Sequence, residues 1–99
     1  MTALTDIKTR GFINGNWADA LSGRTFEVHN PATGDAVAVV ANMGRDDALA
    51  AVAAAHAALP AWRAATAKER STKLKAWHAL ILEHADRLAL LMTTEQGKP

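Results

Sequence analysis

The sequence predicts an α/β fold in which N-terminal β-hairpins are followed by about three helices. Most turn-forming residues lie between positions 11 and 42, where Gly, Asn and Pro separate short apolar runs. Residues 45–97 are instead rich in alanine, leucine and charged residues, with apolar side chains spaced as on one helix face. We therefore expect a flexible N-terminus at 1–10 and an incomplete domain at 11–99, made of a hairpin region (11–42) and a helical region (45–97).

Three turns organise the hairpin region. An Asn-Gly pair at 14–15, flanked by apolar residues, predicts a tight turn because both residue types accept a positive φ. A second turn at 21–24 precedes a strand-like alternation at 25–29. The clearest turn is 30–35, where proline fixes one φ and glycine supplies a positive one. The apolar run at 36–41 then reads as the returning strand of a hairpin.

The first helix is expected to begin near Arg45. Asp46 and Asp47 lie where negative charge stabilises a helix N-terminus. Proline disfavours helical geometry in the residue before it, so Pro60 is expected to end this helix at or before Leu59. One apolar face is predicted, made of Leu49, Val52, Ala53 and His56.

Two further helices follow. Thr66 and Glu69 have the spacing of a capping box, which predicts a second helix start. The polypeptide is expected to break and restart at 83–86, and Gly97 is placed to cap the third helix. The apolar stripes are Leu74, Trp77, His78 and Ile81 on the second helix, and Leu88, Leu91 and Met92 on the third.

Composition excludes several classes of function. With 49% hydrophobic and 21% charged residues, the sequence has the composition of a soluble globular protein. A net charge of +1 argues against nucleic acid or an anionic membrane as partner. The N-terminus lacks the apolar stretch of a signal peptide, and no run approaches a membrane span, so we expect a cytoplasmic protein. The sequence has no cysteine, which removes disulfides, thiolate–metal sites and a cysteine nucleophile from these 99 residues.

Few side chains are spaced for chemistry. The four histidines at 29, 56, 78 and 84 match no metal-ligand pattern, and structural roles are favoured for them. The adjacent Asp46 and Asp47 do not share a helix face, so we interpret them as helix-dipole residues. The scattered glycines form neither a Gly-x-Gly-x-x-Gly motif nor a P-loop. We predict no catalytic and no cofactor-binding residue in this chain.

A basic stretch and three tryptophans remain. A phosphate-binding helix is one interpretation of the basic stretch, but a solvated helix face is favoured in a protein of net charge +1. Its members are Lys68, Arg70, Lys73 and Lys75. Trp17, Trp62 and Trp77 are too far apart for a base-stacking platform and are interpreted as partly buried packing anchors.

Taken in order, several segments resemble the N-terminal part of the aldehyde dehydrogenase family, over residues 11–99. They are Phe-Ile-Asn-Gly-Asn-Trp at 12–17, Val-His-Asn-Pro-Ala-Thr-Gly-Asp at 28–35, the helix with Asp46, Ala48, Val52 and Ala54, Pro-Ala-Trp-Arg at 60–63, Lys-Glu-Arg at 68–70 and Glu-Gln-Gly-Lys-Pro at 95–99. The forms at 62–70 and 92–99 are similar to the succinate-semialdehyde dehydrogenase branch.

The resemblance implies an NAD(P)-dependent oxidation of an aldehyde, succinate semialdehyde first, to its carboxylate. In the family a cysteine thiolate adds to the carbonyl, hydride passes to the nicotinamide, and water activated by a glutamate hydrolyses the thioester. These groups lie downstream of the region matched here. The resemblance therefore implies a fragment that is inactive and binds no NAD or NADP alone, and that belongs to a homo-oligomer when complete.

The resemblance also implies a cation site. Many family members hold a monovalent cation through the backbone carbonyl before the Asn-Pro pair and through an acidic residue before the Gly-Lys-Pro run. Here those positions are His29 and Glu95, and the family often has Asp at the second of them. The early hairpin resembles a part that helps subunits to pack, and the helices resemble those flanking the cofactor domain's sheet.

Two other functions stay open on the residues alone. The first is a non-catalytic helical module, or a remnant of a longer protein, that binds a partner through its Ala- and Leu-rich faces. The second is a small nucleic-acid binder that uses the basic stretch at 68–75, which predicts strongly salt-dependent binding.

Overall fold

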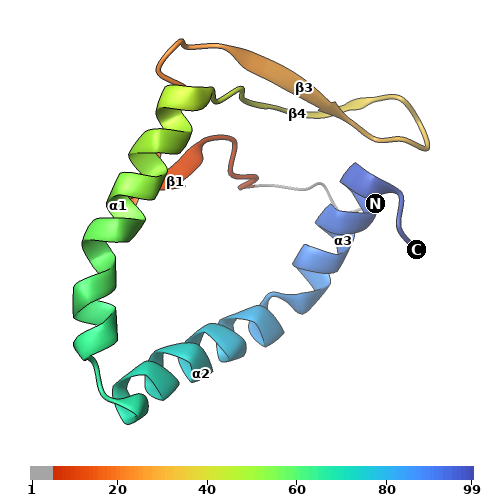
Figure 1. The fold of residues 1–99 in the computed structure, drawn as a ribbon. Helices are drawn as coiled ribbons and strands as arrows, with labels where there is room; N and C mark the ends of the chain where they lie inside the picture. The colour runs from red at the N-terminus through yellow and green to blue at the C-terminus, as the bar shows by residue number, and fades with distance from the viewer. Residues whose placement is uncertain (1–5) are drawn as a thin grey trace.

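The computed structural model describes residues 6–99, which form two antiparallel hairpins followed by three helices (Figure 1). This confirms the predicted α/β arrangement. Residues 1–5 of the expected N-terminal segment lie outside the described residues; within 6–10, the Thr9 carbonyl accepts a hydrogen bond from the Ala41 amide at 2.8 Å. The elements are β1 (Gly11–Ile13), β2 (Asn16–Ala18), β3 (Thr25–His29), β4 (Ala36–Ala41), α1 (Arg45–Ala64), α2 (Ala67–Glu83) and α3 (Ala85–Gln96).

The β1–β2 hairpin closes through the predicted Asn-Gly turn. Asn14 has φ 52° and Gly15 has φ 76°, so both central residues of the two-residue loop are left-handed, as a type I′ turn requires. The strands pair Phe12 with Trp17, and their ring centroids are 4.8 Å apart at an interplanar angle of 56°. Cross-strand aromatic pairing of this kind stabilises a short hairpin.

The β3–β4 hairpin is closed by the loop 30–35. The Asn30 side-chain oxygen accepts a hydrogen bond from the Ala32 amide at 2.9 Å, and the Asn30 carbonyl accepts one from Gly34 at 2.7 Å. Gly34 takes the positive φ predicted for it, 79°. The pairing shifts register between Val28 and His29, so the strand is irregular where it enters the loop.

The prediction that Pro60 ends the first helix was wrong, because α1 continues to Ala64 with the proline inside it. The proline ring removes one amide donor, yet the residues beyond it remain free to adopt helical geometry. The last turn closes normally: the Ala65 amide donates to the carbonyls of Ala61 and Trp62, each at 3.2 Å.

The boundaries of α2 and α3 follow the predicted caps. The Thr66 hydroxyl accepts from the Glu69 amide at 3.1 Å, and the Glu69 carboxylate accepts from the Thr66 amide at 3.0 Å. His84 departs from helical geometry between the two helices, with φ −104° and ψ 16°. Gly97 ends α3 with φ 77°, and its amide donates to the Thr93 carbonyl at 2.8 Å.

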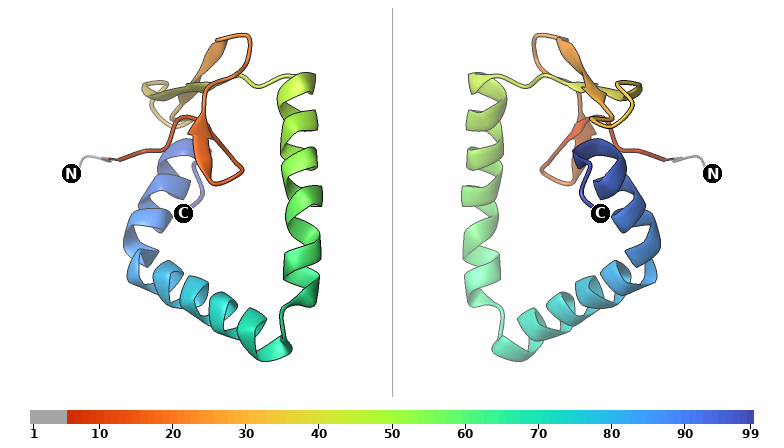
Figure 2. Two further views of the ribbon diagram at one scale, coloured as in Figure 1. Left: turned by 90° about the vertical axis from the view of Figure 1, so that its left-hand side faces the viewer. Right: turned by 90° about the vertical axis from the view of Figure 1, so that its right-hand side faces the viewer.

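The elements form an open frame (Figure 2). The helices run along three sides, and the β3–β4 hairpin spans from the start of α1 towards the end of α3. The radius of gyration is 16.7 Å, whereas a compact domain of this length has about 13 Å. Within residues 6–99, only Ala20 and Asp47 are buried. The described residues therefore enclose almost no core of their own.

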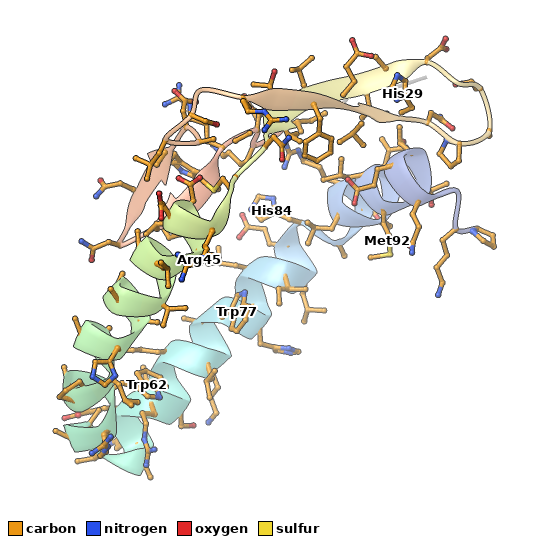
Figure 3. The ribbon with its side chains drawn as sticks, turned by 45° about the horizontal axis from the view of Figure 1, so that its top comes forward. His29, Arg45, Trp62, Trp77, His84 and Met92 are labelled. Carbon is orange, nitrogen blue, oxygen red and sulfur yellow. The ribbon has the colours of Figure 1, made fainter. Side chains whose placement is uncertain are left out.

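The expected tryptophan anchors are consequently unequal. Trp17 and Trp62, which were predicted to be partly buried, are exposed over 44% and 40% of their surface. Trp77 on α2 is 63% exposed, so that prediction was wrong for it (Figure 3). The reason is that, among the described elements, none lies over the apolar face of α2. Apolar side chains of α1 and α3 are exposed as well, such as Leu49, Val52 and Met92.

Candidate functional site

The β3–β4 loop and the end of α3 meet at a close contact. A Cβ atom built on Gly97 would lie 3.0 Å from Pro31 Cγ, so glycine both supplies the left-handed cap and permits this approach. The contact joins the Asn-Pro turn to the Gly-Lys-Pro run, the two segments that the resemblance associates with a cation.

A pocket of about 240 Å³ is lined by the β3–β4 hairpin, α3 and the N-terminal segment. Its apolar wall comes from β3, β4 and α3, while its charged residues come from the N-terminal segment and α3. The lining residues are Asp6, Ile7, Lys8, Val28, Val37, Ala38, Val40, Arg87, Leu88, Leu91 and Glu95.

Of the two residues predicted for a cation, Glu95 lines this pocket and His29 does not. Glu95 lies in the last turn of α3 and lines the pocket, as does Val28, the strand residue before His29. The His29 imidazole is engaged elsewhere, with Nε2 at 2.9 Å from a Glu27 carboxylate oxygen (Figure 3 labels His29 on the hairpin). Its side chain is therefore no ligand here, and the expectation concerns its backbone carbonyl alone.

The charged side chains on this pocket are two carboxylates, Asp6 and Glu95, and two cations, Lys8 and Arg87. A carboxylate together with backbone carbonyls provides the oxygen ligands that hard cations prefer. Lys8 and Arg87 carry formal charges opposite to those of Asp6 and Glu95. Among residues 6–99, no group of three His, Cys, Asp or Glu side chains is arranged to hold a metal ion.

Asp47 has a role that sequence reasoning missed. Its carboxylate accepts hydrogen bonds from the Leu21 amide at 3.0 Å and the Gly44 amide at 2.8 Å, and the residue is 6% exposed. It thus caps α1 and fastens the β2–β3 loop to it, beyond the predicted helix-dipole effect. Its position three residues after Gly44 is a local sequence signal for capping. No local signal predicts the hydrogen bond to Leu21, which is 26 residues away.

The other candidate residues are dispersed. His56, His78 and His84 are exposed and lie far apart along the helices. Lys68, Lys73 and Lys75 are exposed on α2, which confirms the solvated face for them. Arg70 is not part of this solvated face, because its Nε is buried without a hydrogen-bond partner among the described residues. Arg70 lines an open hollow at the α1–α2 corner, with Trp62, Ala67, Ser71 and Leu74.

The described helices were also compared with the requirements for a membrane-spanning helix. Among residues 6–99, no helix combines the length and the hydropathy that crossing a membrane requires.

Comparison with known proteins places these features in a family. The model of the aldehyde dehydrogenase family matches residues 17–99. The protein is 54% identical over 92 residues to a glutarate-semialdehyde dehydrogenase of Pseudomonas putida and, equally, to an NADP⁺ succinate-semialdehyde dehydrogenase of Escherichia coli. Each alignment covers 93% of this chain and 19% of the relative, so the sequence spans about a fifth of their length.

The fold agrees with the sequence comparison. The crystal structure of a succinate-semialdehyde dehydrogenase from Burkholderia pseudomallei superposes with a TM-score of 0.93 at 42% identity. The match covers 99% of this chain and 21% of that one. The open arrangement of hairpins and helices is therefore a conformation found within a larger enzyme.

Proposed function

Because the chain belongs to the aldehyde dehydrogenase family, we propose that it forms the N-terminal part of an enzyme that oxidises an aldehyde to its carboxylate with NAD or NADP. The observation that carries this proposal is the combined match of sequence and fold over nearly all of its residues. The identity reaches 54% to the Pseudomonas putida relative, and the TM-score is 0.93 to the Burkholderia pseudomallei structure. A shared fold alone hosts many functions, so the sequence identity is what narrows the chemistry.

The substrate we propose is a small semialdehyde, succinate semialdehyde first. The relatives described above are named for succinate or glutarate semialdehyde. Both molecules carry an aldehyde at one end and a carboxylate at the other, so an enzyme for either must bind an anionic tail at a fixed distance from the reacting carbonyl.

The role of these 99 residues in that enzyme is structural. They contain no thiol, so a cysteine nucleophile comes from other residues of the complete enzyme. The nicotinamide, when bound there, accepts the hydride. What this segment offers is three helices with uncovered apolar faces, which pack against the rest of the enzyme and hold the hairpins in place.

The size of the uncovered surface supports this role. The exposed surface amounts to 7948 Å², whereas a folded protein of this mass exposes about 5,400 Å². The excess of roughly 2,500 Å² is more than one partner contributes to a typical interface between separate proteins. A permanent contact with the rest of the enzyme accounts for this excess surface better than a transient docking site does.

We also propose that the complete enzyme is a homo-oligomer and that the β1–β2 hairpin contributes to its assembly. Phe12 is 60% exposed and contacts the exposed Trp17 through tilted rings, and aromatic residues are favoured at protein interfaces. Light scattering of the complete enzyme measures this, and a monomer at micromolar concentration would contradict it.

A third proposal concerns the cation. We propose that the His29 carbonyl and the Glu95 carboxylate contribute to a monovalent cation site in the complete enzyme. A cation that binds only the folded state raises the melting temperature as its concentration rises. Replacing Glu95→Gln is expected to abolish the rise with K⁺ or Na⁺, while the matched Glu83→Gln, at the end of α2, retains it. An unchanged K⁺ response in the Glu95 variant would exclude the site.

The activity is tested with the complete polypeptide that carries this segment, purified from cells that make it. Reduction of NAD⁺ and NADP⁺ is followed with succinate semialdehyde, glutarate semialdehyde and an uncharged aldehyde of similar length. We expect both semialdehydes to be oxidised with a higher kcat/KM than the uncharged aldehyde. Absence of reduction with every aldehyde would refute the proposed function; preference for the uncharged one would refute the substrate class alone.

A further inference from the structure

The tip of the β1–β2 hairpin carries a pair of residues whose chemistry the proposed function does not use. Asn14 and Gly15 are both exposed, and both have positive φ. Beyond its two chain neighbours, no residue has an atom within 4 Å of a Cβ built on Gly15. We propose that Asn14 is a site of spontaneous deamidation, with the closed hairpin limiting its rate.

The reaction needs only water. The backbone nitrogen of Gly15 attacks Cγ of Asn14 and loses its proton, and the bond between Cγ and Nδ2 breaks to release ammonia. The five-membered imide that results is opened by water at one of its two carbonyls. Opening at the backbone carbonyl gives an isoaspartyl linkage, and opening at the other gives aspartate at position 14. No oxidation occurs, and no cofactor is required.

The sequence provides its own controls for this chemistry. Attack requires an unhindered nitrogen, and glycine is the residue type that places no side chain beside it. Asn16 precedes the bulky Trp17, and Asn42 precedes Met43. Asn30 precedes a proline, whose nitrogen carries no proton and has no place for a further bond. Asn14 is therefore the asparagine in this sequence with the least obstructed neighbour.

The hairpin opposes the reaction while it is closed. A type I′ turn fixes the backbone on both sides of the Asn14–Gly15 peptide bond, and the Asn16 side chain adds a 3.1 Å hydrogen bond to the Asn14 carbonyl. Ring closure requires this peptide unit to rotate until its nitrogen faces Cγ of Asn14. Only three residue pairs join the strands, and short two-stranded hairpins are marginally stable. Transient opening therefore sets the rate.

The two products differ in their effect on the fold. Aspartate at position 14 keeps the number of backbone atoms, and Asp-Gly still suits a type I′ turn. The isoaspartyl linkage inserts an extra backbone carbon into a two-residue loop, so the pairing of Ile13 with Asn16 can no longer form unchanged. Both products place a new negative charge at the tip. Formation of the isoaspartyl product thus loosens the hairpin and exposes the Phe12–Trp17 pair further.

The test follows the conversion of each asparagine by mass spectrometry of peptides from a hybrid enzyme, kept at neutral to mildly alkaline pH, in which these 99 residues replace the matching segment of the Escherichia coli succinate-semialdehyde dehydrogenase. A blocked peptide of residues 13–16, too short to pair, gives the rate without the hairpin. We expect conversion at Asn14 and not at Asn16, Asn30 or Asn42, at a rate below that of the peptide. Gly15→Ala is expected to suppress it.

A second variant tests whether opening of the hairpin limits the rate of deamidation. Phe12→Ala removes the ring contact with Trp17, which should raise the population of the open turn and the rate at Asn14 roughly 3- to 10-fold, towards that of the peptide. Lys73→Ala, exposed on α2, is the control and leaves the rate unchanged. No conversion at Asn14, or equal conversion at the other asparagines, would refute the site. If the protein without these substitutions reacts as fast as the peptide, the closed hairpin does not limit the rate, and that part of the proposal is refuted.

Discussion

Asp47 shows how one side chain joins two parts of this protein that are distant in sequence. Its two carboxylate oxygens accept from amides 26 and three positions away, in the β2–β3 loop and at the start of α1. Side-chain acceptors at a helix N-terminus satisfy donors that the helix leaves free. The same residue therefore determines where α1 begins and where the β1–β2 hairpin lies relative to it.

We expect Asp47→Ala to destabilise the protein by about 2 kcal/mol, because two amides lose a charged acceptor. Asp47→Asn retains one acceptor oxygen, and about half that loss is expected. The host for the measurement is a hybrid in which these 99 residues replace the matching segment of the Escherichia coli succinate-semialdehyde dehydrogenase. Urea unfolding gives the midpoints, and Asp46→Ala at the exposed neighbouring position is the control. Equal effects at positions 46 and 47 would contradict the fastening role.

Gly97 is constrained both by its left-handed backbone and by its contact with Pro31, whereas Gly23 has the left-handed backbone alone. Gly97 and Gly23 have similar positive φ, 77° and 74°, but of the two only Gly97 has a neighbour within 4 Å of a built Cβ, Pro31. Gly23→Ala in the hybrid is expected to cost about 1 kcal/mol for the left-handed backbone. Gly97→Ala should cost about 2 kcal/mol, since the alanine methyl also displaces the proline. Identical costs in urea unfolding would show that the Pro31 contact carries no energy.

At the scale of elements, α1 tolerates a residue that helices normally exclude. Pro60 lies in the last turn and a half of the helix, where it removes one amide donor while the turn beyond it still closes. The long alanine-rich stretch before it has high helix propensity, which offsets that loss. The helix therefore passes through the proline to end at Ala64.

Pro60→Ala should stabilise this helix, because it restores the missing amide donor and removes the ring's clash with the preceding turn. In a peptide of residues 44–66, we expect far-UV circular dichroism to report clearly higher helicity, equivalent to about 1–3 kcal/mol in favour of the helix. Leu59→Ala keeps the proline and is the control. Helicity that rises equally in both variants would assign the effect to the added alanine and not to the loss of the proline.

Local signals in the sequence identified most of the elements and their ends. The Asn-Gly turn, the Thr66 capping box and the Gly97 cap depend on residues within a few positions of one another, so their chemistry is visible in the sequence. The helix end at Pro60 was predicted wrongly, because the high helix propensity of the residues around the proline outweighs its effect on the preceding residue. The bond from Asp47 to Leu21 and the contact of Gly97 with Pro31 join distant segments, and no local pattern encodes them.

The cation site that the resemblance implies at His29 and Glu95 stays a prediction. The structure places Glu95 on the same pocket as the strand that precedes the Asn-Pro turn. Lys8 and Arg87, which also line this pocket, were not anticipated. They lie on segments that pack together only in three dimensions.

At the scale of the whole molecule, the protein has apolar helix faces without a core. Its composition is that of a globular protein, yet Ala20 and Asp47 are the only buried residues among those described. Hydrophobic burial is the main favourable contribution to folding, so these faces require cover. The family relatives, of which this sequence spans about a fifth, contain the additional polypeptide that we propose as that cover.

The hybrid enzyme tests this account most directly. Steady-state oxidation of succinate semialdehyde with NADP⁺ is compared between the hybrid, the parent enzyme from Escherichia coli and the parent without the exchanged segment. We expect the hybrid to retain kcat/KM within about tenfold of the parent, a loss of at most about 1.4 kcal/mol of transition-state stabilisation, and the shortened parent to be inactive. A soluble, folded hybrid with no activity above that of the shortened parent would contradict the account.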